Sequence, residues 1–538
     1  MHAILLLLLL SSGGIAQSAA QLGRADDAPE ATAAITAAAA TLRGDLDRVI
    51  RAPGWRNDAW SVLVVSLENG DTLFSRSPDE ALVPASNVKL FTTAAALYYL
   101  GGDYRFSTFL LADGPVRDSV LYGDLVIYGT GDPTIADRFG SKNAVWEAFA
   151  DTLVAAGIRE VRGAVVGDAS YFTGPGSGVG WQLSYIDASY AAPASALSFA
   201  ENIAVLEIRP AEQTGWRPVV SLIPGGEGIG IVNQATTVAR GRTRIRAFRS
   251  EYGGPLRING QIARNSKPVM RWVPISDPAR YAAAAFREVL EESGIAVTGG
   301  VRSAERAQDS PVTGRTVFAP AFDQAAPVRV LAIHNSPPLL EILDVINKKS
   351  HNLLAEQVLR AVGRVAAGDG SVNGGVKAIH HMLEHGAGIE AVTPDQLTLF
   401  DGSGLSAENR VTARSLVQLL AFVERSTLWE SFWSTLPEAG VRRGGLGRMG
   451  QTPAAGNLRA KTGTINRVSA LSGYVTSADG ERLAFSIISN NVPSTWRAKR
   501  VEDAIGARLA SFRRAARAGP SRGAITEAPA PAPAPAPA

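Results

Sequence analysis

Three short stretches decide the fold: Ser86-Asn-Val-Lys89, Ser350-His-Asn352 and Lys461-Thr-Gly463. They match the patterns S-x-x-K, S-x-N and K-T-G in this order along the chain. Either S-x-x-K or K-T-G alone recurs by chance in long sequences. The ordered set is more specific, because each motif falls where the sequence pattern predicts a suitable element. We expect a helix start at the first motif, a loop between helices at the second and a strand at the third.

The first motif predicts a serine nucleophile. Residues three positions apart on a helix share a face, so Lys89 should lie beside Ser86. Pro84 places Ser86 near the helix start, where the helix dipole stabilises a developing alkoxide. Lysine acts as a base only when its pKa is lowered, and we expect burial and the nearby cation of Lys461 to lower it. Lys89 is therefore the expected base.

The second motif predicts groups that move and hold protons. We expect the Ser350 hydroxyl to relay a proton between Lys89 and the leaving amine. The side-chain amide of Asn352 can hold both Lys89 and the backbone of the substrate. Ser350 and Asn352 are thus candidate catalytic residues.

The third motif predicts a substrate-binding strand. Lys461 would attract a substrate carboxylate, and the hydroxyls of Thr462 and Thr464 would donate hydrogen bonds to it. Gly463 would let the substrate approach the strand edge. We expect the backbone N–H groups of Ser86 and Thr464 to form an oxyanion hole.

Composition limits the alternatives. A chain of 538 residues is expected to form two or three folding units, and 46% hydrophobic residues suffice for a large core. A net charge of +3 over this length does not indicate a protein that binds nucleic acid. The absence of cysteine excludes disulfides, thiolate catalysis and Cys-ligated zinc. We expect neither a cofactor nor a metal ion.

Both ends of the chain have segments of unusual amino-acid composition. A leucine run that ends at small residues predicts a signal peptide over residues 1–20 and hence secretion, with a buried N-terminal helix as the alternative. Alternating Ala and Pro predict an extended tail over residues 518–538.

Hydrophobic periodicity predicts the main elements. Asn69-Gly70 between two β-rich runs, residues 60–68 and 71–76, predicts a hairpin. A helix is expected from Pro84 to Leu100, and the segment 327–364 has a helical pattern. Three more strands are expected near the C-terminus, at residues 457–464, 468–476 and 483–490.

Residues 501–517 predict a last helix with one apolar face. Its apolar positions are Ile505, Leu509, Phe512 and Ala516. We expect this face to pack on the core. Its basic residues leave peripheral contact with a wall or membrane surface as the alternative.

Two stretches of the middle region resemble each other. Phe149, Leu153, Gly157 and Ile158 have the same spacing as Phe286, Leu290, Gly294 and Ile295. Each set predicts a helix with a glycine stop that leads into a strand. Two αβ units and a chance similarity both explain this pattern.

Three other patterns are treated as decoys. Residues 445–450 match G-x-G-x-x-G but lack the flanking strand and helix of a dinucleotide site, so we expect a loop. His380, His381 and His385 lack the context of a metalloprotease and are interpreted as a helix end. Ser403 is expected near the site without being its nucleophile.

The sequence around the motifs resembles the class C low-molecular-mass penicillin-binding proteins, which are D-alanyl-D-alanine carboxypeptidases/endopeptidases. The resemblance runs from about residue 55 to 495. It rests on the segments 84–93, 123–133, 192–202, 336–356, 401–410 and 436–440. One departure is His351, because the family usually has Asp at the middle of S-x-N.

The resemblance implies an α/β (α+β) architecture. A transpeptidase/β-lactamase-like domain, with a five-stranded antiparallel sheet and flanking helices, would comprise residues 31–103 and 325–517. Residues 104–324 would form one or two smaller inserted α/β domains.

The same resemblance implies a periplasmic or secreted enzyme of the bacterial cell envelope. It would cleave peptidoglycan peptides through an acyl-enzyme on Ser86, and β-lactams would trap that intermediate. Two alternatives remain at this point: a β-lactamase or esterase with the same Ser/Lys site, and a catalytically silent protein that binds peptidoglycan.

Overall fold

The computed structural model describes residues 27–223, 229–312, 328–386 and 395–514. The expected signal peptide at 1–20 and the tail at 518–538 lie outside these residues. Residues 42–512 form one compact unit. Among the described helices, none combines the length and the apolar character needed to cross a bilayer.

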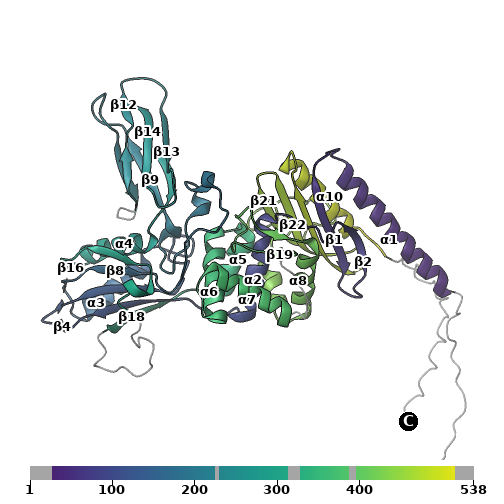
Figure 1. Ribbon diagram of the computed structural model, residues 1–538, viewed down its shortest axis with the longest axis horizontal. Coiled ribbons are helices and arrows are strands. Elements are labelled where there is room, and N and C mark those ends of the chain that lie inside the picture. The colour runs from purple at the N-terminus through teal and green to yellow at the C-terminus, as the bar shows by residue number, and fades with distance from the viewer. Residues whose placement is uncertain (1–26, 224–228, 313–327, 387–394, 515–538) are drawn as a thin grey trace, which may run out of the picture. The chain divides into compact units, whose positions relative to one another are not determined.

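A five-stranded antiparallel sheet is formed by the parts of the chain on either side of the insertion, as expected (Figure 1). Its strand order is β2-β1-β23-β22-β21. Two strands precede Ser86 and three follow residue 457, as the sequence predicts. The strands are β1 Ala59–Ser66, β2 Thr72–Arg76, β21 Arg459–Ile465, β22 Val468–Thr476 and β23 Arg482–Asn490.

Helices from several parts of the chain flank this sheet. The helix α8 packs against β1 and β23, while α10 packs against β22. The helix α2 follows Ser86 and contacts α5 and α6. The helices are α1 Asp27–Arg51, α2 Val88–Tyr99, α5 Leu339–Lys349, α6 Asn352–Ala367, α7 Val372–His381, α8 Ala413–Arg425, α9 Trp429–Thr435 and α10 Thr495–Ala510.

The last helix, α10, begins six residues earlier than predicted. The Ser494 side chain accepts a hydrogen bond from the Arg497 N–H, which caps the helix at its true start. The helix ends at Ala510 rather than at residue 517. Ile505 and Leu509 in the helix and Phe512 just beyond it are buried, which confirms core packing of this face, whereas Ala516 lies outside the described residues.

The inserted segment builds its own mixed five-stranded sheet, in the order β17-β8-β6-β3-β18. Its strands are β3 Ser107–Asp113, β6 Asp124–Gly129, β8 Val165–Asp168, β17 Val301–Ala304 and β18 Val328–Asn335. The prediction of helix over all of 327–364 is wrong for β18. This strand pairs with β3 more than two hundred positions away, so long-range pairing decides its conformation. Because β18 belongs to the inserted sheet, this sheet extends beyond residue 324, where the insertion was expected to end.

Two αβ units lie within the insertion. In one, α3 Ala144–Ala155 leads to β7 Glu160–Val161 and β8; in the other, α4 Pro278–Glu292 leads to β16 Ala296–Val297 and β17. The strands β7 and β16 pair in parallel, as do β8 and β17. Gly157 and Gly294 end the two helices with φ of 77° and 80°. This correspondence supports two related units over a chance similarity.

The rest of the insertion is mainly β-structure. One small sheet has the order β10-β9-β15, another joins β11, β12 and β13 to β14, and β4 and β5 extend the β16-β7 pair. These strands are β4 Val116–Arg117, β5 Val120–Leu121, β9 Ile203–Arg209, β10 Val219–Ile223, β11 Ile231–Asn233, β12 Thr236–Val238, β13 Arg244–Phe248, β14 Leu256–Ala263 and β15 Val269–Pro274. A further short pair joins β19 Leu397–Thr398 to β20 Arg410–Val411.

Candidate active site

Ser86 and Lys89 lie together at the start of α2, as predicted. Ser86 sits in a 3₁₀ turn, Ala85–Asn87, that runs directly into the helix. The Lys89 ammonium Nζ lies 3.1 Å from Ser86 Oγ. The hydroxyl is therefore within hydrogen-bond reach of its expected base.

Lys89 is completely buried and held by three oxygen atoms. Besides Ser86 Oγ, its Nζ donates to Asn352 Oδ1 at 2.7 Å and to the Ser403 carbonyl at 2.6 Å. Burial lowers the pKa of Lys89 to about 7, although the carboxylates of Asp401 and Glu356 oppose this shift. A lysine with this pKa is partly neutral near pH 7 and can accept a proton.

Ser350 contacts the other lysine of the site. It ends α5 in the left-handed conformation, with φ of 57°. Lys461 Nζ donates to Ser350 Oγ at 2.9 Å and to the Thr462 carbonyl at 3.0 Å. Lys461 is buried, and burial together with the charge of Lys89 lowers its pKa well below the ordinary value.

Gly463 brings β21 directly against the nucleophile turn. A Cβ at position 463 would lie 2.6 Å from the Pro84 carbonyl oxygen and 3.1 Å from the Ser86 nitrogen. The Asn87 side-chain amide also donates to the Lys461 carbonyl at 3.2 Å. The missing side chain thus permits close packing between strand and turn, a role that the motif alone did not predict.

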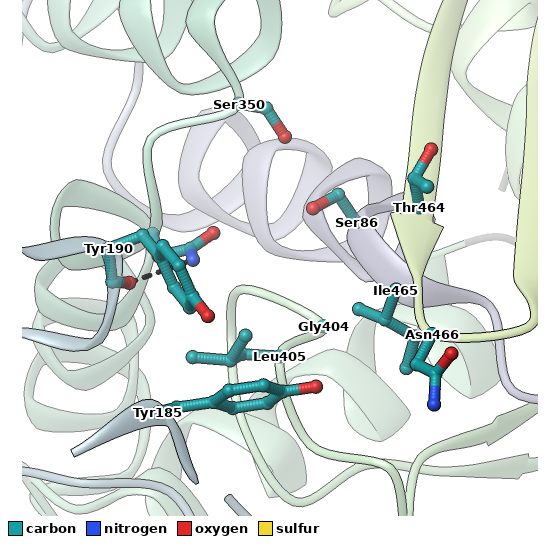
Figure 2. Close-up of a pocket in the computed structure, with 10 residues that line it drawn as sticks. Ser86, Tyr185, Tyr190, Ser350, Gly404, Leu405, Thr464, Ile465 and Asn466 are labelled. Atoms are coloured by element: carbon teal, nitrogen blue, oxygen red, sulfur yellow. Dashed lines mark hydrogen bonds between the residues drawn. The ribbon is translucent and has the colours of Figure 1, made fainter. Parts of the chain in front are cut away.

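A cavity of about 460 Å³ opens over these groups (Figure 2). In Figure 2, Ser86, Ser350 and Thr464 surround the same space as Tyr185, Tyr190 and Leu405. The lining comprises Ser86, Tyr185, Tyr190, Ser350, Asn352, Gly404, Leu405, Thr464, Ile465 and Asn466. Four of the eight predicted residues therefore reach the cavity, whereas Lys89, Lys461, Thr462 and Gly463 are not among its lining.

The sequence analysis did not predict that the inserted segment would reach the site. Tyr185 and Tyr190 line the cavity from this segment, and the Tyr190 carbonyl accepts a hydrogen bond from Asn352 Nδ2 at 2.9 Å. A backbone carbonyl leaves no signature in a sequence, so only the folded insertion reveals this contact.

A buried carboxylate fixes the loop that holds Lys89. Glu356 Oε1 accepts the N–H groups of Gly402 and Ser403 at 3.0 and 2.9 Å, and Glu356 Oε2 pairs with Arg360 at 3.2 Å. Burial raises the pKa of Glu356 to about 7. Ser403 lies next to the site, as expected, and contributes its carbonyl oxygen rather than a nucleophile.

The decoy motifs lie in the places expected for them. Residues 445–450 form a loop before β21. His381 ends α7 and His385 lies in the helical turn that follows it, Met382–Gly386; both are exposed, and their rings stack with centroids 4.3 Å apart. Within the described residues, no group of three potential metal ligands occurs.

Comparison with known proteins assigns the family. The model of the D-Ala-D-Ala carboxypeptidase 3 (S13) family matches residues 42–512. A D-alanyl-D-alanine carboxypeptidase from Actinomadura sp. (strain R39) is 35% identical over 483 residues, which cover 88% of this chain and 85% of the relative.

Solved structures share the fold. Penicillin-binding protein 4 (dacB) from Haemophilus influenzae superposes with a TM-score of 0.69 at 24% identity, over 87% of this chain and 97% of that protein. A structure of the same protein complexed with a β-lactam gives a TM-score of 0.66 at 23% identity, over 85% and 98%. The chain belongs to the D-Ala-D-Ala carboxypeptidase 3 (S13) family, and it is a serine D-alanyl-D-alanine carboxypeptidase.

Proposed function

We propose that Ser86 is the nucleophile and Lys89 the base of this carboxypeptidase. The observation that carries the proposal is the 3.1 Å contact between Lys89 Nζ and Ser86 Oγ, made by a buried lysine whose pKa burial lowers to about 7. Ser86 Oγ attacks the carbonyl carbon of the penultimate D-alanine, and its proton moves to Lys89.

Collapse of the tetrahedral intermediate releases D-alanine and leaves an ester on Ser86. The leaving amine takes a proton from the Ser350 hydroxyl, which is replenished from Lys461 Nζ at 2.9 Å. Water then attacks the ester and gives up a proton through Ser350 to Lys461, the Ser86–acyl bond breaks, and Ser86 takes back its proton from Lys89. Asn352 positions Lys89 through its Oδ1 throughout these steps.

The motif strand binds the substrate in this proposal. The N–H groups of Ser86 and Thr464 form the oxyanion hole, and each such donor typically contributes about 3 kcal/mol. The terminal carboxylate is held by the Thr464 hydroxyl, which lines the cavity, in the field of Lys461. Thr462 and Gly463 maintain the strand that presents these groups.

The natural substrates are peptidoglycan stem peptides. An endopeptidase reaction at a D-alanyl–diaminopimelate crosslink would use the same acyl-enzyme. A β-lactam would acylate Ser86 in the same way, which the complex of the Haemophilus influenzae protein supports. These substrates place the enzyme in the bacterial cell envelope, outside the cytoplasm.

Peripheral contact with the wall or membrane surface belongs to the same proposal. Trp496 is 65% exposed at the start of α10, and the Arg500 guanidinium lies 5.2 Å from its ring centroid. Aromatic and basic side chains together favour interfaces of this kind. Sedimentation with anionic vesicles, compared between the wild type and Trp496→Ala, tests this contact; equal sedimentation would contradict it.

Mass spectrometry after treatment with penicillin tests the nucleophile. We expect one covalent adduct on the peptide that contains Ser86, and release of D-alanine from a stem pentapeptide by the untreated enzyme. Ser86→Ala should lose both the adduct and the release of D-alanine.

Ser434→Ala is the matched control, because Ser434 is exposed on α9. It should keep both activities. An adduct on another serine, or an adduct that persists in Ser86→Ala, would overturn the assignment.

A further inference from the structure

The inserted segment contacts the S-x-N loop through a charged side chain. His351 Nε2 lies 3.2 Å from Glu201 Oε2, and both side chains are mostly buried, with 16% and 17% exposed. His351 stands between Ser350 and Asn352 in the chain, and both of these line the active-site cavity. A shift of the His351 backbone would therefore displace its two chain neighbours, both of which reach the site.

Glu201 is also held in place by a second partner, Arg138. Arg138 holds it in two contacts, Nε to Oε1 at 2.5 Å and Nη2 to Oε2 at 3.3 Å. Burial alone would raise the pKa of Glu201, but hydrogen bonds from His351 and Arg138 outweigh it and lower the pKa to about 2. The carboxylate is thus charged at any working pH.

The backbone around Glu201 is strained. Ala200, Glu201 and Asn202 all have positive φ, of 51°, 55° and 54°. Such conformations cost about 1–2 kcal/mol per residue outside glycine. The turn persists because Asn202 Nδ2 donates to the Pro193 carbonyl and to Ser198 Oγ. Strain of this kind is retained where surrounding structure enforces a particular side-chain position.

The two ring nitrogens of His351 have separate partners. Nδ1 accepts the Leu354 N–H at 3.5 Å and so caps α6, whereas Nε2 faces Glu201. The hydrogen bond to Nδ1 stabilises the start of α6. The contact of Nε2 with Glu201 positions the S-x-N loop relative to the insertion. The two roles can therefore be separated by substitution.

We propose that Glu201 is a positioning residue for the reaction: its contact with His351 Nε2 holds Ser350 and Asn352 in register with Ser86 and Lys89. Through Glu201, the inserted segment thereby affects the rate of acylation, although Glu201 itself does not contact the substrate. The inference rests on the proposed role of Ser86.

A matched pair of variants tests it. His351→Gln places an amide N–H near the position of Nε2 and keeps the contact with Glu201, but gives up the cap. His351→Asn places an acceptor near the position of Nδ1 and keeps the cap, but is too short to reach Glu201. Glu201→Gln removes the charge and one acceptor.

Stopped-flow measurement of penicillin acylation gives the rate constant and the binding constant separately. We expect His351→Asn and Glu201→Gln each to lower the acylation rate constant ~10-fold, with binding within about twofold of wild type. The double variant should lose no more than the single variants, because both break one contact. His351→Gln should keep the rate within about threefold while lowering the melting temperature.

Glu207→Gln serves as the control, because Glu207 pairs with Arg209 on β9, within the insertion and outside the cavity lining. It should acylate like wild type. If His351→Asn acylates normally, or if His351→Gln is the slower variant, the positioning role of Glu201 is wrong. If the wild type forms no adduct on Ser86, the proposed function fails instead, so the two failures are distinguishable.

Discussion

At the scale of single residues, the site depends on a buried amine, that of Lys89, and a buried carboxyl group, that of Glu356. Lys89 and Glu356 are both 0% exposed, and burial moves both pKa values towards 7, one downwards and one upwards. Burial disfavours the charged form of each group, which is the common cause. The two are linked through Ser403, whose N–H donates to Glu356 and whose carbonyl accepts from Lys89.

The lowered pKa of Lys89 predicts how the rate depends on pH. Below about pH 7 the amine carries a proton and cannot accept one from Ser86, so acylation by penicillin should fall about tenfold per pH unit. Above pH 7 the rate should level off. Stopped-flow acylation between pH 5.5 and 9 measures this profile. Lys142→Met, at an exposed ion pair with Asp137, should keep the profile, and a flat profile in the wild type would exclude Lys89 as the base.

Glu356 predicts a stability effect. Glu356→Ala leaves Arg360 buried without its carboxylate partner, and breaking such a pair costs about 3–5 kcal/mol. Urea denaturation should show this loss in the free energy of unfolding. Glu292→Ala, exposed at the end of α4, should stay within about 0.5 kcal/mol of wild type. A similar small change in Glu356→Ala would mean that the pair contributes little.

At the scale of elements, close packing between β21 and the nucleophile turn predicts the effect of Gly463→Ala. The added methyl group would meet the Pro84 carbonyl oxygen at 2.6 Å, so strand or turn must shift. Overpacking costs about 1–3 kcal/mol, which corresponds to a ~5- to 150-fold loss in the acylation rate if the whole cost falls on the position of Ser86. Penicillin labelling over time measures this rate.

The control for this variant is Gly300→Ala, because a Cβ at position 300 would meet no atom within 4 Å. It should label at the wild-type rate. Normal labelling of Gly463→Ala would show that β21 can move away without disturbing the nucleophile.

Elements with local signals were predictable, and those that depend on distant partners were not. The hairpin around Asn69-Gly70 and the helix after Pro84 follow from turn chemistry and periodicity. The strand β18 was missed because its conformation is set by pairing with β3. Likewise, the motifs revealed Ser86, Lys89 and Asn352, whereas the approach of Tyr190 and Glu201 depends on how the insertion packs.

At the scale of the whole molecule, the insertion and the catalytic half share one compact unit. We propose that the catalytic domain comprises residues 31–103 together with the chain from α5 onwards, and that the insertion extends from residue 104 to the end of β18. The pairing of β18 with β3 supports this limit over residue 324.

The unit and the family match both end at residue 512, which predicts the effect of truncation. Removal of residues 518–538 should leave penicillin acylation and the melting temperature unchanged. Removal from residue 501 onwards should prevent folding, because it deletes the buried Ile505, Leu509 and Phe512. Circular dichroism and penicillin labelling of both truncations decide this. A large loss on removing 518–538 alone would assign the tail a structural role.

The pairing of β1 with β23 has a consequence for biosynthesis. Trp60 of β1 pairs with Ser489 of β23, 429 positions later in the chain, so β1 cannot complete its pairing until almost the entire polypeptide has been made. At ribosomal rates of about 5–20 residues per second, the edge of β1 that faces β23 remains unpaired for ~20–80 s after β1 is made, whereas its other edge can already pair with β2. Nascent chains consequently expose an unpaired strand edge that is prone to aggregation, and any message with a stop codon before β23 yields no complete sheet.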